Sequence, residues 1–483
     1  MKLKSINSNK WIPVVSGVAV FTLRTILAYL YIYPRLTLNP ATAEKPNVIL
    51  ISVDTLAANH LGTYGYNRDT SPNIDKFAAE NTVFDNAYTP VPCTAPSYAS
   101  LLTGLYPSTH NSFSTPLDAK YTTLAQSFKN VGYNTAGIVS TGMLADNIGG
   151  LGRGFDTYDG IDQKDVRAGK NNTYGVNGDT MALQKGQRTT DEASAWLKNN
   201  SNNKFFLFLQ YVDPHLPYGQ DVPYKDKYVT DDTNNTLSNP DRQQDAYYKN
   251  SPTPEETTYL RDKYDENVSY LDNQLGKLLD QIKSQGLYDN SIIILTADHG
   301  ESFDHNTLGH CWRLYDSTVQ VPLIVHQPKV TPIVKRVADD VSLIDIYPTL
   351  SARLGFKPNK YNFDGVDLSP ALNNTKLARE SVYSMSNALS KGGGGELPHQ
   401  TLFIGLLYMQ ISGNDRVIYN QNSGTTEEYN TGNDPGELTN IFNTSVKSSY
   451  EKLMLWIANH PLGDNTVKLN DEKYKTLQGL GYL

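Results

Sequence analysis

The chain has 483 residues, of which 42 are Lys or Arg and 50 are Asp or Glu, so its formal net charge is −8. A negatively charged chain lacks the electrostatic basis for coating nucleic acid, and we exclude nucleic acid as a partner. Hydrophobic residues make up 39 % and cysteines number two, which is typical of a globular protein and excludes a disulfide-built scaffold.

The N-terminal region divides into basic residues 1–10, mostly apolar residues 11–33 and a tether at 34–45. The apolar stretch is long enough to cross a bilayer, so we expect a membrane anchor and an extracytoplasmic catalytic domain. Residues 41–43, Ala-Thr-Ala, also fit a signal-peptidase site, which makes secretion after cleavage the alternative. Arg24 within the stretch keeps a third interpretation open, a buried helix of a soluble protein.

Three continuous apolar runs each end at or just before an acidic residue: 47–53 at Asp54, 205–212 at Asp213, and 292–296 before Asp298. Such runs are typical of parallel strands that are buried on both faces. Apolar residues at helical spacing in 265–282 predict a helix between them. We therefore predict an α/β fold with a mostly parallel sheet sandwiched by helices, whose carboxyl edge gathers the three aspartates.

Two polar stretches, 162–186 and 219–253, have little apolar periodicity, and we predict that they are loops that shape specificity. Segments 402–410 and 416–419 near the C-terminus have the pattern of strands. We therefore divide the chain beyond the tether into a catalytic domain, 46–375, and a small C-terminal α+β subdomain, 376–483.

Three short motifs at the predicted sheet edge carry residues suited to chemistry. Val-Asp-Thr-Leu at 53–56 ends a strand, and Asp-His-Gly-Glu at 298–301 places a carboxylate beside an imidazole, which suits one metal ion. The loop 93–104 offers the hydroxyl of Thr94 before a predicted helix whose N-terminal amides would favour an anion. Taken alone, Asp54 could instead cap a turn and Thr94 could cap a helix.

In this order the motifs resemble the sulfatase family of the alkaline phosphatase superfamily, from residue 46 to about residue 372. Further segments agree with the resemblance: 71–75, 102–104, 152–156, 213–218, 314–317, 321–324 and 345–350. The resemblance implies an alkaline-phosphatase-like fold. It also implies metal-assisted displacement at sulfur or phosphorus by a side-chain nucleophile, through a covalent intermediate.

The resemblance also assigns roles to individual residues. The implied ligands of one divalent cation are Asp54, Thr94, Asp298 and His299. The nucleophile would be Thr94, while His215 and His310 would contact the anionic group of the substrate and protonate the leaving oxygen. Either histidine could instead be structural. The ligand set suits Mn²⁺ or Zn²⁺ as well as Mg²⁺ or Ca²⁺.

The sequence departs from the family at the nucleophile. Sulfatases of the usual type read Cys-x-Pro-x-Arg, with the cysteine converted to formylglycine, whereas this chain has Thr94 and Tyr98 at the two positions. An aldehyde hydrate releases sulfate by breaking its own carbon–oxygen bond, but a threonyl sulfate would need a second attack at sulfur. Thr94 therefore favours phosphorus chemistry. Thr55 replaces a frequent second metal aspartate, and a less cationic site suits singly charged diesters.

We thus predict a metal-dependent hydrolase or transferase that acts through Thr94 on phosphate esters, preferably diesters, at or outside the cell surface. It resembles the phosphodiesterases and the phosphoglycerol or phosphoethanolamine transferases of the superfamily. The alternatives are a sulfatase proper and a degenerate surface binding protein. Cys93 precedes Thr94 and Cys311 follows His310. The sequence leaves open whether they form a disulfide or are two unrelated small residues.

Overall fold

The computed structural model describes residues between 45 and 462, with gaps at 114–115, 160–184, 220–222, most of 230–251, 359–360, 388–405 and 444–447. The predicted N-terminal anchor or signal segment and much of the two predicted specificity loops lie outside the described residues. Across the described part of the chain, we find no helix with the length and apolar character to span a membrane. Residues Pro46–Leu483 belong to one compact unit.

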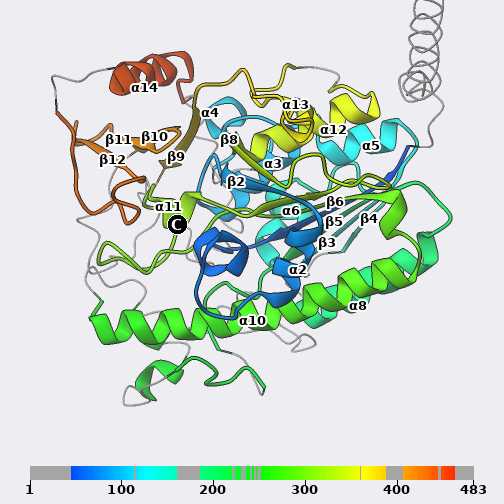
Figure 1. Cartoon of the computed structure of the whole chain (residues 1–483). Coiled ribbons are helices and arrows are strands. Elements are labelled where there is room, and N and C mark those ends of the chain that lie inside the picture. The colour runs from blue at the N-terminus through cyan, green and yellow to red at the C-terminus, as the bar shows by residue number, and fades with distance from the viewer. Residues whose placement is uncertain are drawn as a thin grey trace, which may run out of the picture. The chain divides into compact units, whose positions relative to one another are not determined.

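The centre of this unit is an eight-stranded sheet (Figure 1) with the order β4-β3-β5-β1-β6-β7-β2-β8. Its strands are β1 Asn47–Val53, β2 Thr82–Tyr88, β3 Asn134–Val139, β4 Thr157–Asp159, β5 Phe205–Tyr211, β6 Ser291–Ala297, β7 Leu323–His326 and β8 Arg336–Ser342. Strand β7 runs antiparallel to β6 and β2, and the other neighbouring strands are parallel. The prediction of a mostly parallel α/β sheet is confirmed.

The central strands are buried along their whole length. All seven residues of β1, of β5 and of β6 are buried, as the uninterrupted apolar runs predict. Strand β1 pairs with β5 on one side and with β6 on the other, so the three runs that end in acidic residues are adjacent. Parallel pairing brings their carboxyl ends to one edge of the sheet.

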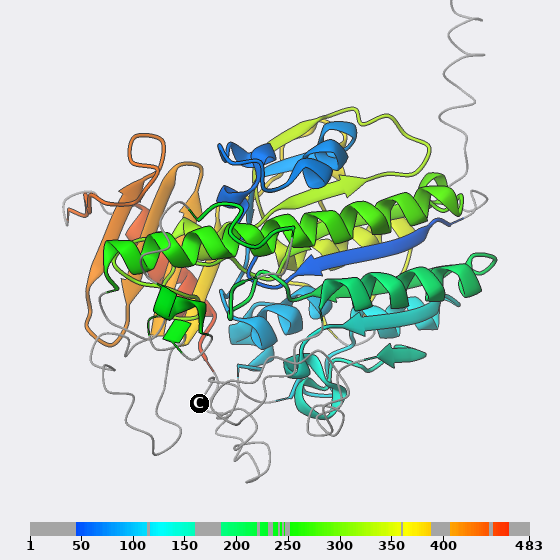
Figure 2. The same ribbon diagram turned by 90° about the horizontal axis from the view of Figure 1, so that it is seen from below.

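Helices cover both faces of the sheet (Figures 1 and 2). On one face lie α2 Pro72–Glu80, α8 Gly186–Asn200 and α10 Pro254–Ser284; on the other lie α3 Thr94–Thr103, α5 Leu124–Asn130, α12 Ile346–Leu354 and α13 Ser369–Leu372. Further short helices are α4 Pro107–His110, α6 Asp146–Gly149 and α11 Asp316–Val319. Helix α10 contains the predicted helix 265–282 and begins with a capping box formed by Thr253 and Glu256.

A second, antiparallel sheet lies toward the C-terminus, with the order β12-β11-β10-β9. Its strands are β9 Val382–Asn387, β10 Leu406–Ser412, β11 Asp415–Asn420 and β12 Thr426–Asn430, and helix α14 Ser448–Asn459 packs on it. Leu453 and Trp456 of α14 are buried against Tyr408 and Met385 of the sheet. The small α+β part is therefore confirmed, whereas its boundary at residue 376 stays a prediction.

Arg416 on β11 connects the small sheet to the large one. It is 2 % exposed, and its Nε donates to Asp316 Oδ1 at 2.8 Å while its Nη2 donates to the Tyr88 hydroxyl on β2 at 2.6 Å. Glu437 accepts the backbone N–H of Asp316 at 2.7 Å, so Arg416 lies among two acidic side chains. Met409 of the small sheet joins the same apolar cluster as Tyr88, and the two sheets share a core.

We expect Arg416→Met to lower the free energy of unfolding by about 3 kcal/mol or more, because it removes the cation that pairs with the half-buried carboxylate of Asp316 next to the buried carboxylate of Glu437. Chemical denaturation measures the loss. The matched control is Arg336→Met, which breaks an ion pair with Asp85 whose arginine is 49 % exposed and should cost at most about 1 kcal/mol. Equal losses in the two variants would contradict the role of Arg416.

Candidate active site

Two carboxylates and an imidazole meet at the carboxyl ends of β1 and β6. Because the strands pair in register, Asp54 directly after β1 lies beside Asp298 directly after β6, and His299 follows. Asp54 is 1 % exposed, and Asp298 and His299 are fully buried. One ligand atom from each of the three lies within 4.8 Å of the others, which is the grouping expected of metal ligands.

The hydrogen bonds of His299 fix the direction of its lone pair. Its Nδ1 donates to the carbonyl of Gly300 at 2.9 Å, and a carbonyl can only accept, so Nδ1 carries the proton. The unprotonated Nε2 lies 3.6 Å from Asp298 Oδ2 and 3.8 Å from Asp54 Oδ1. Burial lowers the pKa of His299 well below its ordinary value, and the nearby His310 lowers it further. The imidazole is therefore neutral and free to bind a cation.

Both carboxylates of the cluster have a raised pKa. Burial raises the pKa of Asp54 to about 7, although His310 acts in the opposite direction. The pKa of Asp298 is well above its ordinary value because of burial first and the charge of Asp54 second. Asp298 Oδ2 is buried and has no hydrogen-bond partner among the described residues. Buried oxygen donors, one of them orphaned, together with one imidazole nitrogen, fit a divalent cation.

Thr94 brings its hydroxyl to this cluster from the first turn of α3. Its Oγ1 lies 3.2 Å from His299 Nε2 and 3.4 Å from Asp54 Oδ1, and the residue is fully buried. Ser97, one turn later, donates to the backbone carbonyl of Asp298 at 2.7 Å and so ties α3 to the end of β6. The structure therefore brings together all four residues that the sequence nominated as metal ligands.

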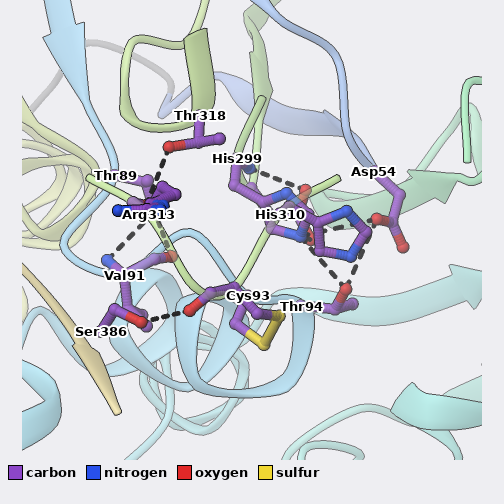
Figure 3. The surroundings of a disulfide bond; sticks show 12 residues. Asp54, Thr89, Val91, Cys93, Thr94, His299, His310, Arg313, Thr318 and Ser386 are labelled. Carbon is purple, nitrogen blue, oxygen red and sulfur yellow. Dashed lines mark hydrogen bonds and ion pairs between the residues drawn. A yellow bond between two sulfur atoms is a disulfide. The ribbon is translucent and has the colours of Figure 1, made fainter. Parts of the chain in front are cut away.

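His215 and His310, the two histidines expected to contact the substrate, lie beside the cluster. The His310 ring is 4.4 Å from the His299 ring and 5.2 Å from the His215 ring, centroid to centroid. His310 Nδ1 donates to Glu301 Oε1 at 3.0 Å, and the Tyr218 hydroxyl donates to Glu301 Oε2 at 2.9 Å. Figure 3 shows His310 alongside His299, with Thr94 and Asp54 close by.

The two histidines differ in protonation. Burial disfavours the charged form of His310, but Glu301 and Asp54 favour it more strongly, so the pKa of His310 is above its ordinary value. Burial and the charge of His310 lower the pKa of His215 to about 4. His215 Nδ1 donates to the carbonyl of Leu216 at 2.7 Å, which leaves Nε2 as an acceptor. The site thus holds one imidazole suited to give a proton and one suited to take it.

Sequence reasoning missed the partners of these residues. Gln210 donates its Nε2 to Asp54 Oδ2 at 3.2 Å, and the signal was one polar residue inside the apolar run 205–212. Glu301 is the last residue of the Asp-His-Gly-Glu motif, but the sequence did not indicate a role for it. Nothing in the sequence indicated that Tyr218 reaches Glu301.

Asp213 does not join the metal-ligand cluster, contrary to the expectation that three aspartates share one site. It follows β5 at the same sheet edge, but its Oδ1 accepts the backbone N–H of Gly186 at 2.8 Å at the start of α8. Tyr98, at the family's arginine position, is fully buried. Burial, and then the charges of Asp298 and Asp54, raise its pKa well above the ordinary value, so the phenol is neutral.

The structure joins Cys93 and Cys311 in a disulfide, a pairing that the sequence left open. Their Cα atoms are 4.7 Å apart, although 218 residues separate them along the chain. Figure 3 shows the bridge beneath Thr94, His299 and His310. A cysteine that is committed to a disulfide has no thiol to be converted to an aldehyde.

Comparison with solved structures supports the fold. The phosphonate monoester hydrolase of Agrobacterium radiobacter superposes with a TM-score of 0.67 at 21 % identity, covering 86 % of this chain and 96 % of that one. The phosphonate monoester hydrolase of Silicibacter pomeroyi gives a TM-score of 0.68 at 21 % identity, covering 88 % and 97 %. At these identities the similarity shows the shared architecture.

Sequence comparison gives the family. A protein named sulfatase from Formosa agariphila is 25 % identical over 468 residues, which cover 85 % of this chain and 86 % of the relative. Arylsulfatase K of Gallus gallus is 26 % identical over 498 residues, covering 95 % and 91 %. The sulfatase family profile matches residues 46–356, well over half of the chain. The chain therefore belongs to the sulfatase family of hydrolytic enzymes, within the alkaline phosphatase superfamily.

Proposed function

We propose that this protein is a metal-dependent hydrolase or transferase of phosphate esters, preferentially diesters, with Thr94 as its nucleophile. The observation that carries the proposal is the position of the Thr94 hydroxyl, 3.2 Å from His299 Nε2 and 3.4 Å from Asp54 Oδ1 in a fully buried cluster. A hydroxyl held between a carboxylate and a neutral imidazole can lose its proton as it attacks.

One divalent cation would be held by Asp54, Thr94, Asp298 and His299. The mixed oxygen and nitrogen donors suit Mn²⁺ or Zn²⁺ as well as Mg²⁺ or Ca²⁺, and they do not select among them. When bound, the cation supplies Lewis-acid stabilisation of the negative charge that develops on oxygen.

The side chains of the chain itself account for the proton transfers. Thr94 Oγ1 attacks phosphorus, and its proton passes to the Asp54 carboxylate. The bond from phosphorus to the leaving oxygen breaks, and that oxygen takes a proton from His310 Nε2. Water, deprotonated by the neutral Nε2 of His215, then attacks the phosphorus of the threonyl phosphate. The bond from phosphorus to Thr94 Oγ1 breaks, and Oγ1 takes back the proton from Asp54. The proton on His215 replaces the one that His310 gave up. An acceptor alcohol in place of water makes the same reaction a transfer.

Phosphorus chemistry is supported by the residue at the nucleophile position. Threonine cannot become the formylglycine of the usual sulfatases, and the neighbouring Cys93 is engaged in a disulfide. Water can attack a threonyl phosphate at phosphorus without an aldehyde hydrate. Tyr98 places a neutral phenol where the family has arginine, and a less cationic site favours the smaller charge of a diester.

A sulfatase proper is the second candidate, because curated relatives of this chain carry that name. The third candidate is a surface binding protein, motivated by the changes at Thr55 and Tyr98. The orphaned Asp298 carboxylate argues against it, since a buried, unpartnered oxygen is costly in a protein that has no cation to bind.

We further infer an extracytoplasmic location, with residues 11–33 as a membrane anchor or, after cleavage, as a removed signal. The apolar composition of that stretch and the Cys93–Cys311 disulfide support this location, because disulfides persist in oxidising compartments. The proposed domain boundaries are 46–375 for the catalytic domain and 376–483 for the C-terminal subdomain. The substrate would then be an ester at or outside the cell surface.

Replacing the nucleophile tests the mechanism. We expect Thr94→Val to lower kcat on an aryl phosphodiester by at least about 10³-fold, because valine keeps the shape of threonine and removes its hydroxyl. The matched control is Thr103→Val in the same helix. In the described structure the Thr103 Oγ1 donates a hydrogen bond to the backbone carbonyl of Ala99 at 2.6 Å, and we expect this variant to keep the wild-type kcat. Steady-state kinetics with each candidate metal provides the measurement.

The substrate panel for wild type comprises an aryl phosphodiester, a phosphomonoester and a sulfate ester. Faster turnover of the sulfate ester would contradict the phosphorus assignment and establish the sulfatase. Retained turnover in Thr94→Val would reject Thr94 as nucleophile. Absence of both metal binding and turnover of any ester would favour the binding protein.

Metal dependence is tested without a substrate. We expect saturating divalent metal to raise the Tm of wild type, since a cation at about 100 times its Kd stabilises the folded state by about 2.7 kcal/mol. Asp298→Asn should abolish the shift, because it removes a proposed ligand. It should also stabilise the metal-free protein, because it removes a carboxyl group whose pKa burial raises and which must take up a proton on folding. Differential scanning calorimetry in chelator and in metal measures both. Asp213→Asn, at the same sheet edge, should keep the shift; loss in this control but not in Asp298→Asn would contradict the assignment.

A further inference from the structure

The disulfide joins the two segments that carry the proposed nucleophile and the proposed acid. Thr94 directly follows Cys93, and His310 directly precedes Cys311. The two segments are 218 residues apart in sequence and come from different layers of the fold, one from the start of α3 and one from the loop after β6. The bridge is therefore the covalent link that lies nearest to both groups (Figure 3).

The loop that carries His310 has little regular structure of its own. Between the end of β6 and the start of α11 the chain forms an isolated bridge between Ser302 and Gly309. The Cys311 N–H donates to the carbonyl of Pro92 at 2.7 Å, and the Ser386 hydroxyl on β9 donates to the carbonyl of Cys311. Cys311 is thus linked to the nucleophile segment through its backbone N–H as well as through its side chain.

The backbone at Cys311 argues that its side chain is needed. Its φ is 76°, in the left-handed region that glycine adopts freely and other residues adopt at a cost. A residue other than glycine at such a position is explained when its side chain does something that glycine cannot do. Here that is the bond to Cys93.

Three of the four proposed metal ligands do not depend on this link. Asp54 and Asp298 follow β1 and β6, which pair directly along seven residue positions, and His299 is adjacent to Asp298. Loss of the bridge should therefore move Thr94 and His310 relative to each other while leaving the three strand-end ligands in place.

We propose that the Cys93–Cys311 disulfide is a positioning element that holds Thr94 and His310 in reacting geometry, so that turnover requires the bridge and a dithiol reductant switches the enzyme off. The proposal rests on the proposed function of these two residues. In the reaction, two electrons and two protons pass from the dithiol to the bridge, which gives two cysteine thiols and the cyclic disulfide of the reductant. Cys93 and Cys311 are both partly exposed, so a small dithiol can reach them.

The first experiment treats the metal-loaded full chain with dithiothreitol. We expect kcat to fall by about 10- to 100-fold as the thiols appear, because misplacement of a reacting group by about 1 Å has an effect of this size. KM should change less than kcat, and metal affinity should stay within about threefold. Reoxidation should restore kcat.

The matched variant is Cys93→Ser combined with Cys311→Gly, in which glycine accepts the left-handed backbone without strain. We expect the same loss of kcat, native metal affinity and no further response to dithiothreitol. The chain has no other cysteines, so this insensitivity also excludes an effect of the dithiol on the metal. All assays are run at a temperature at which circular dichroism shows the variant fully folded. Wild-type kcat in this folded variant would overturn the proposal.

A substrate-free measurement separates this proposal from the proposed function. Hydrogen exchange in the metal-loaded variant should be faster at residues 93–97 and 308–312 and unchanged in β1 and β6. If wild type turns over no ester, the proposed function fails, and the exchange result alone decides the positioning role. Unchanged exchange in both segments would overturn it.

Discussion

The structure depends on the parallel pairing of β1 with β6, which forces two carboxylates together in the protein interior. Asp54 and Asp298 directly follow paired residues at the ends of two adjacent strands, and both side chains are buried. Burial raises the pKa values of both groups, and the charge of Asp54 raises the pKa of Asp298 further. Such an arrangement is unfavourable in isolation, and a buried core of this size supplies the stability to maintain it. We propose that a bound cation makes this pair of carboxylates part of a reactive centre.

The second constraint is that the reacting groups come from segments outside those two strands. Helix α3 delivers Thr94, and Ser97 fixes the helix to the backbone of Asp298. Glu301 and Tyr218 orient His310 from the other side. The proposed cation site therefore lies mainly at the ends of two paired strands, whereas the proposed nucleophile and the proposed acid belong to a helix start and a loop that need additional links. The disulfide between Cys93 and Cys311 is such a link.

The differences from the usual sulfatase motif form a consistent set. Threonine at the nucleophile position removes the aldehyde route, and the adjacent cysteine is used for a disulfide. A neutral tyrosine at the arginine position leaves the two buried carboxylates dependent on a cation for compensation. Each change lowers the positive charge at the site or alters the proposed covalent intermediate, and together they motivate the proposal of a phosphate ester as the substrate.

The sequence by itself determined the central strands, the mostly parallel sheet and the position of Asp54 and Asp298 at one edge of it, because uninterrupted apolar runs are a local pattern typical of buried parallel strands. The four-residue ligand set came from the resemblance to the sulfatase family. The tertiary structure decided the rest: that Asp213 binds the amide of Gly186, that Gln210 reaches Asp54, and that Arg416 connects the two sheets. It also decided the pairing of Cys93 with Cys311. These contacts join residues far apart in sequence through irregular loops, whose paths depend on packing and which no periodicity encodes.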